Sequence, residues 1–208
     1  MNRLSIPATA ALLLIMGAAA QATTAPAVQR RPGGGLAVPA ALSAARLGMS
    51  LGEWKALPFP GAPDARVQPV CSNDPGAGRG DFLALSASDR RAGAVVCGYA
   101  ARYGTFALSE ALPLDQRYLA TRVRYVFVGG RLAQIRYRAS RDAFDDLIAI
   151  LKSAYGPPRA TQRDTMKTSM GRLDRVQMTW SAPTSRAVLT DPADSALDIG
   201  VQVSAAKP

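Results

Sequence analysis

The chain contains no histidine, the side chain that most often serves as a general base or a metal ligand near neutral pH. Its absence excludes Ser-His-Asp and Cys-His triads and every histidine-metal site. We therefore expect no catalytic residue, no metal site and no cofactor. A histidine-free enzyme that uses carboxylates or lysines remains open as a third interpretation of function.

The chain also lacks an apolar run long enough to span a bilayer comfortably, which takes about 20 residues. The longest such stretch, residues 6–20, follows a positively charged start at Arg3 and ends at the small-residue pattern Ala20-Gln21-Ala22. This arrangement is typical of a cleavable signal peptide over residues 1–22. The sequence predicts a periplasmic or secreted protein, cleaved near Ala22, that is not transmembrane.

Cysteine is scarce, since only Cys71 and Cys97 occur. An even pair in an exported protein favours one disulfide bond over two free thiols. The bond would span a separation of 26 residues and stabilise the fold by roughly 3 kcal/mol on the chain-entropy model. A metal or redox pair fits poorly, because there is no C-x-x-C spacing and no histidine.

Acidic residues are outnumbered, with 15 Asp and Glu against 25 Lys and Arg, a net charge of +10. Only four of the basic residues are lysines, so nearly all of the positive charge is carried by arginine. An arginine-rich composition is explained either by genomic base bias or by a surface that attracts anions, such as lipid headgroups, acidic polysaccharide or an acidic protein. Because the protein is expected outside the cytoplasm, nucleic acid is not an expected partner.

The domain plan follows from composition. Residues 23–45 are rich in Pro, Gly and Ala and predict a flexible tether after the signal peptide. Residues 46–205 predict a single α+β domain. A division of this domain into two helix-plus-sheet halves near residue 140 is left open.

Two helices are predicted within this domain. Ser50 and Glu53 form a capping box, which predicts a helix over about 51–57 that ends before Pro58. Ser140 precedes an apolar stripe at 3- and 4-residue spacings, which predicts a helix over about 141–155 that ends at Gly156.

The remaining pattern predicts strands. Period-2 alternation and short connections favour antiparallel sheet, with both helices packed on one face. Residues 72–94 are expected to be mostly loop, with a short strand at 82–85. The other expected strands are 67–71, 95–102, 105–108, 122–128, 132–138, 176–180, 186–190 and 197–203.

The hairpin around Gly129-Gly130 carries the main candidate site. A two-residue turn would mix polar and apolar side chains on each face, so we expect a three-residue loop with Gly130 in the left-handed position. One face then holds Val123, Tyr125, Phe127, Ile135 and Tyr137. The other holds Gln134 and the four arginines, Arg122, Arg124, Arg136 and Arg138.

Like charges directly opposite each other destabilise a sheet, so these arginines need compensation. Acidic residues on neighbouring strands would supply it and make the face structural. The alternative is that Arg122, Arg124, Arg136 and Arg138 bind an anion or a partner. Both explanations are kept.

The start of the expected domain resembles a known family. Residues Leu47-Gly48-Met49-Ser50, followed by Glu53, Leu57 and Pro60-Gly61, are similar to the opening of the SmpA/OmlA family of small envelope proteins. A later stretch of the chain, which ends in Tyr155-Gly156-Pro157, is similar to β-lactamase-inhibitor-like periplasmic proteins. The resemblance implies a non-catalytic interaction module of the cell envelope. The leading interpretation is therefore an envelope protein that contacts another protein, and the alternative is a binder of anionic lipid or polysaccharide through the arginine face.

Overall fold

The computed structural model describes residues 43–59, 67–75, 83–103, 106–109, 111–114, 119–169 and 171–206. The expected signal peptide and nearly all of the expected tether lie outside these residues. None of the described helices is long and apolar enough to cross a membrane.

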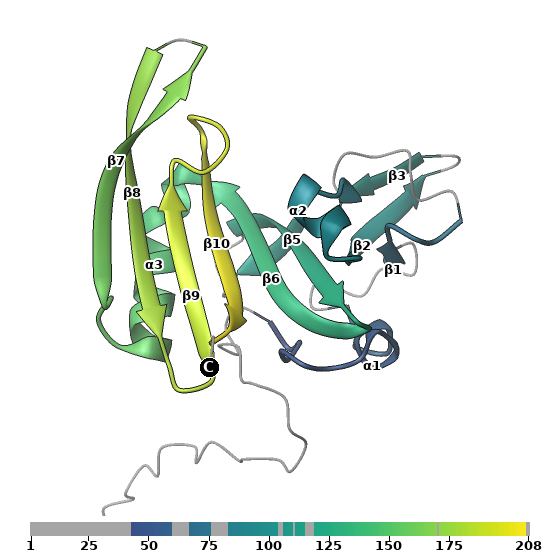
Figure 1. Ribbon diagram of the computed structural model, residues 1–208. Coiled ribbons are helices and arrows are strands. Elements are labelled where there is room, and N and C mark those ends of the chain that lie inside the picture. Colours follow the sequence, from purple (N-terminus) through teal and green to yellow (C-terminus); the bar gives the residue numbers. More distant parts are fainter. Residues whose placement is uncertain are drawn as a thin grey trace, which may run out of the picture. The chain divides into compact units, whose positions relative to one another are not determined.

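Ten antiparallel strands of the described chain form one continuous sheet, in the order β1-β2-β5-β6-β10-β9-β8-β7 (Figure 1). In addition, β3 pairs with β2 and β4 pairs with β5. The strands are β1 Val67–Cys71, β2 Val95–Tyr103, β3 Phe106–Ser109, β4 Ala111–Leu114, β5 Leu119–Val128, β6 Arg131–Ser140, β7 Ala160–Thr168, β8 Gly171–Ser181, β9 Ser185–Asp191 and β10 Asp198–Ala205. The helices are α1 Leu51–Lys55, α2 Ala87–Arg91, the 3-10 helix η3 Arg141–Ala143 and α3 Phe144–Tyr155.

The α+β class and the antiparallel sheet agree with the expectation from sequence. The strand expected at 67–71 is confirmed with the same bounds, and α1 begins at the expected capping box. One expectation about residues 72–94 is wrong, because residues 83–85 of the proposed strand at 82–85 are not a strand. The described residues of this segment are mostly loop, as expected, but they also contain the short helix α2, which was not expected.

The loop of the β5–β6 hairpin is shorter than expected. Val128 pairs with Arg131, so the turn has two residues, Gly129 and Gly130, which both have positive φ. A β-bulge then follows, because Phe127 pairs with Leu132 but Val126 pairs with Gln134. The extra residue in β6 shifts the register by one and restores the expected faces.

The faces of this hairpin are as expected from sequence. Arg122 lies opposite Arg138, and Arg124 lies opposite Arg136. On the other face, the aromatic and branched side chains are buried. These are Val123, Tyr125, Phe127, Ile135 and Tyr137.

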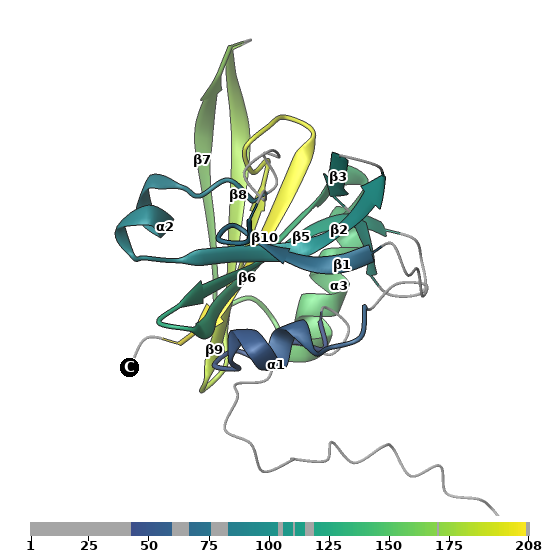
Figure 2. The same cartoon turned by 90° about the vertical axis from the view of Figure 1, so that its right-hand side faces the viewer.

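The main hydrophobic core lies on this second face. Trp54 of α1 and Leu147 and Leu151 of α3 belong to the same buried cluster as the hairpin's apolar side chains. Trp54 also contacts the rings of Tyr99 and Tyr125, at centroid distances of 5.3 and 4.9 Å. A smaller cluster that includes Val96, Ala100 and Val126 lies apart from it. Figure 2 shows α2 and α3 on opposite sides of the sheet.

The expected disulfide is confirmed. Cys71 on β1 and Cys97 on β2 lie directly opposite each other and are joined by an S–S bond of 2.07 Å. Both residues are fully buried. The bond therefore fixes the edge strand β1 to its neighbour.

The order of elements divides near residue 140. In each half, a helix precedes an antiparallel run of strands: α1 precedes β1, β2, β5 and β6, and α3 precedes β7 to β10. The two runs join through β6 and β10, the last strand of each half. The sheet is thus continuous across this boundary, a point that the sequence left undecided.

Candidate binding groove

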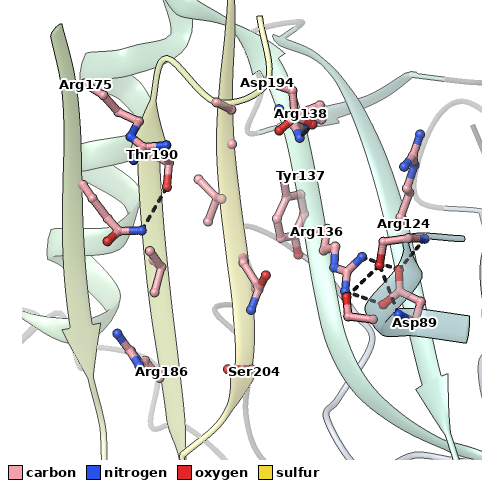
Figure 3. A pocket seen from close by; sticks show the side chains of 18 of the residues that line it. Asp89, Arg124, Arg136, Tyr137, Arg138, Arg175, Arg186, Thr190, Asp194 and Ser204 are labelled. Atoms are coloured by element: carbon pink, nitrogen blue, oxygen red, sulfur yellow. Dashed lines mark hydrogen bonds and ion pairs between the residues drawn. The ribbon is translucent and has the colours of Figure 1, made fainter. Parts of the chain in front are cut away.

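A groove of about 620 Å³ opens on the sheet face that lies opposite the main core (Figure 3). Its floor follows from strand alternation, since neighbours along a strand point to opposite faces. Where Tyr137, Leu189 and Val201 are buried in the core, the residues beside them point into the groove. Strands β5, β6, β10, β9 and β8 all contribute, and α2 closes one side.

The groove is strongly positive. Five arginines and two aspartates line it, which leaves a net charge of +3 among the described lining residues. Figure 3 shows the arginines in two groups, one on the β5–β6 side and one on the β8–β9 side. The charged residues are Asp89, Arg124, Arg136, Arg138, Arg175, Arg186 and Asp194.

Three of the four arginines expected from sequence line this groove, namely Arg124, Arg136 and Arg138. Arg122, at the far end of the hairpin, is exposed and is not among the described lining residues. Arg175 and Arg186 also line the groove and were not predicted from the sequence. Alternation in β8 and β9 could have placed both on a polar face, but only the strand order brings that face beside the hairpin.

Arg136 joins β6 to α2 through hydrogen bonds and an ion pair. Its Nη1 and Nη2 donate to the Asp89 carboxylate at 2.9 and 2.8 Å, and Nε and Nη2 donate to Oε1 of Gln134 at 3.0 and 2.8 Å. Asp89 is only 5% exposed and completes a capping box with Ser86 at the start of α2. The Arg136 guanidinium lowers the pKa of Asp89 to about 2. The expected compensation by an acidic neighbour therefore applies to Arg136, although the carboxylate comes from a helix and not from an adjacent strand.

Arg138 is only partly compensated. Its Nη2 contacts Asp194, a highly exposed residue of the β9–β10 loop. Its Nη1 is buried and has no hydrogen-bond partner. Burial lowers the pKa of Arg138. The charge of Asp198 on β10 opposes this effect, and the charges of Arg124 and Arg136 add to it. The guanidinium of Arg138 is therefore incompletely hydrogen-bonded.

The far side of the groove has a different charge pattern. Arg175 donates to Asp164 of β7, with Nε to Oδ1 at 2.7 Å. Arg186 of β9 is exposed and forms no ion pair with another described residue. Neutral donors and acceptors also line the groove, namely Gln177, Thr190, Gln202 and Ser204.

The letters of two nucleophile motifs occur, G-x-S-x-G at 48–52 and S-x-x-K at 204–207. In the first, the Ser50 hydroxyl accepts from the Glu53 amide at 3.2 Å and caps α1. In the second, Lys207 lies outside the described residues. No cluster of three or more potential metal ligands occurs in the described part of the chain.

Comparisons with protein-family models, curated proteins and solved structures find no match to this chain.

Proposed function

We propose that this chain is a non-catalytic interaction module of the cell envelope that binds an acidic segment of a partner protein in its arginine-lined groove. The observation that carries the proposal is the excess of five arginines over two aspartates in one recessed surface. Arginine clusters are a common means of recognising acidic peptide motifs, because each guanidinium can hold a carboxylate with two parallel hydrogen bonds.

The polarity of the groove favours a polymer over a small molecule. Sites for small organic ligands are lined mainly by apolar and aromatic groups, with a few polar ones for orientation. This groove has the opposite balance, and its one aromatic lining residue, Tyr137, has its side chain buried in the core. An extended peptide fits better, because its backbone can pair with the Gln and Thr side chains while its carboxylates meet the arginines.

The partial burial of the arginines favours a peptide over a lipid surface as the partner. The side chains of Arg136, Arg138 and Arg175 are 28%, 33% and 34% exposed. A flat layer of headgroups reaches projecting cations more readily than partly covered ones on a groove floor. A sugar polymer would be expected to use exposed aromatic rings for stacking, and the described lining offers none. Anionic lipid and polysaccharide therefore remain as the alternative, to be separated by experiment.

A fluorescein-labelled octaglutamate peptide provides the first test. Fluorescence anisotropy at low ionic strength should show that the purified protein binds it, and added salt should weaken the binding. Arg124→Gln combined with Arg186→Gln should weaken binding by about tenfold, since each lost charge contact is worth on the order of 0.5–1 kcal/mol.

A matched pair of arginines, one in β7 and one directly before it, controls for net charge. Arg159→Gln with Arg163→Gln removes the same charge from exposed positions that do not line the groove, and it should change the affinity little. Equal losses in the two double variants would contradict the proposal. Vesicles of phosphatidylglycerol and alginate serve as parallel probes, and tighter binding to either would favour the alternative.

A further inference from the structure

The β9–β10 loop, residues 192–197, places a carboxylate of the protein itself in the groove. Its base is anchored, because Arg141 of η3 forms an ion pair with Asp191, with Nε to Oδ1 at 2.6 Å. The Ala193 amide also donates to the Asp198 carbonyl at 2.7 Å. The tip is exposed, and Asp194 at this tip contacts the Arg138 guanidinium with its side chain 81% exposed.

The two ion pairs of the groove, Asp89–Arg136 and Asp194–Arg138, differ in how easily they can be broken. Asp89 is buried, lies on a helix and receives two hydrogen bonds from Arg136, so its removal would leave the partly buried guanidinium of Arg136 without a carboxylate. Asp194 lies on a loop in contact with water, and an exposed ion pair of this kind contributes little to stability. A second carboxylate can therefore compete with Asp194 for its arginine, but not with Asp89.

Arg138 also has an unused donor on its inner side. Nη1 is buried without a hydrogen-bond partner, so the contact with Asp194 at Nη2 leaves the guanidinium incompletely satisfied. Gly200 of β10 lies directly opposite Arg138 in the sheet. A Cβ at that position would be 3.9 Å from Nη1 and 3.1 Å from the Cβ of Ala193. The missing side chain keeps space between Arg138 and the loop.

We propose that Asp194 is an internal competitor that occupies the principal carboxylate subsite, Arg138, until an acidic segment of the partner displaces it. The inference rests on the proposed function and adds a regulatory element to the same groove. When the partner's carboxylate reaches Arg138, it takes the place of Asp194 at Nη2 and the Asp194 side chain returns to water. Arg124 and Arg136 nearby favour any anion at this point.

Substitution of Asp194 tests the inference with the octaglutamate probe. Asp194→Asn removes the competing charge and should tighten binding by about threefold, the effect of an exposed ion pair of about 0.6 kcal/mol. Asp174→Asn is the control, because it removes the same charge from an exposed position in β8. Its neighbour Arg175 lines the groove, so Asp174 points to the other face of the sheet. It should leave the affinity nearly unchanged.

A double-mutant cycle shows whether the gain comes through Arg138. Arg138→Gln should weaken binding. Adding Asp194→Asn to Arg138→Gln should then change the affinity no more than Asp174→Asn does. Equal gains in the two backgrounds, or equal effects of the two Asp variants, would overturn the competitor role.

The same measurements separate this failure from failure of the proposed function. If octaglutamate does not bind the unaltered protein, both proposals are wrong. If it binds, and binding depends on Arg124 and Arg186 but not on Asp194, only the competitor role is wrong.

Discussion

Asp89 shows how one residue can both begin a helix and hold it on the sheet. Its carboxylate accepts from the Ser86 amide at 3.2 Å, which caps α2, and from two nitrogens of Arg136. Moving two charges out of water is costly, and only good geometry with several hydrogen bonds compensates for it. The pair therefore positions the wall of the groove and is not expected to exchange partners.

The lowered pKa of Asp89 predicts a defined pH dependence of stability. In the folded state the pKa is about 2, against 3.8 for the unperturbed group. Because the folded-state value is depressed, the stabilisation is fully present above about pH 4 and is lost as the pH falls towards 2. We expect this group to contribute on the order of 2 kcal/mol to the free energy of unfolding at neutral pH.

Urea denaturation of the unaltered protein and of Asp89→Asn at pH 6, 4 and 2.5 measures this contribution. The difference between their free energies of unfolding should shrink as the pH falls. The exposed residue Asp174, changed to Asn, should give a small difference that does not follow this trend. A difference for Asp89→Asn that is the same at all three pH values would show that the Arg136 pair is not the cause.

At the scale of elements, the β5–β6 hairpin shows what a pattern can and cannot predict. Alternation of arginine with aromatic and branched residues determines which side chains share a face, because one face must be buried. It does not determine how the register is reached. An odd loop and a two-residue turn with a bulge place the side chains on the same faces, and the structure has the second arrangement.

Other elements were missed for physical reasons. Strand β7 has a polar, mostly exposed sequence with no apolar alternation, and it is a strand because it pairs with β8 along its whole length. Helix α2 has no apolar stripe, since it spans only five residues. Its capping box at Ser86 and Asp89 was the available signal, of the same kind that predicted α1.

The disulfide is expected to act mainly on the edge strand. Cys71 and Cys97 join β1 to β2, and β1 is the terminal strand of the sheet order. Replacing both by Ser removes the cross-link and places two hydroxyls in a buried site. We predict that the free energy of unfolding falls by about 3 kcal/mol, the chain-entropy value for a loop of this size.

Guanidinium denaturation of the Cys71→Ser/Cys97→Ser variant measures this loss, and hydrogen exchange locates it. Amides of β1 should exchange faster, whereas those of the central pair β6–β10 should keep their protection relative to global unfolding. Uniform loss of protection across all strands would contradict a local effect of the bond.

At the scale of the molecule, the candidate site could be predicted only in part. Local alternation identified Arg124, Arg136 and Arg138 on one polar face. It could not show that β10, β9 and β8 continue that face, because the pairing of β6 with β10 joins strands about 60 residues apart in the sequence. The second group of arginines and the two loop or helix carboxylates depend on this long-range pairing.

The same pairing predicts cooperative unfolding. Residues of both halves, including Trp54 and Leu147, share one buried cluster, and the central strands β6 and β10 pair over seven residues. Neither half can unfold without exposing apolar surface of the other. We therefore expect a single equilibrium transition for the described domain, although its sequence order consists of two similar halves.

The two tryptophans allow each half to be observed separately. Trp54 lies in the first half and Trp180 in the second, and both are fully buried. Trp54→Phe leaves Trp180 as the fluorescent reporter, and Trp180→Phe leaves Trp54. Within each variant, the urea midpoint from fluorescence should coincide with that from circular dichroism, the sign of two-state unfolding. Trp180→Phe should also lower the free energy of unfolding by about 1 kcal/mol, because it loses the hydrogen bond from Nε1 to the Gly156 carbonyl at 3.0 Å. Separate midpoints in either variant would show that the β6–β10 pair does not couple the halves, and the groove that spans them would then lack a rigid floor.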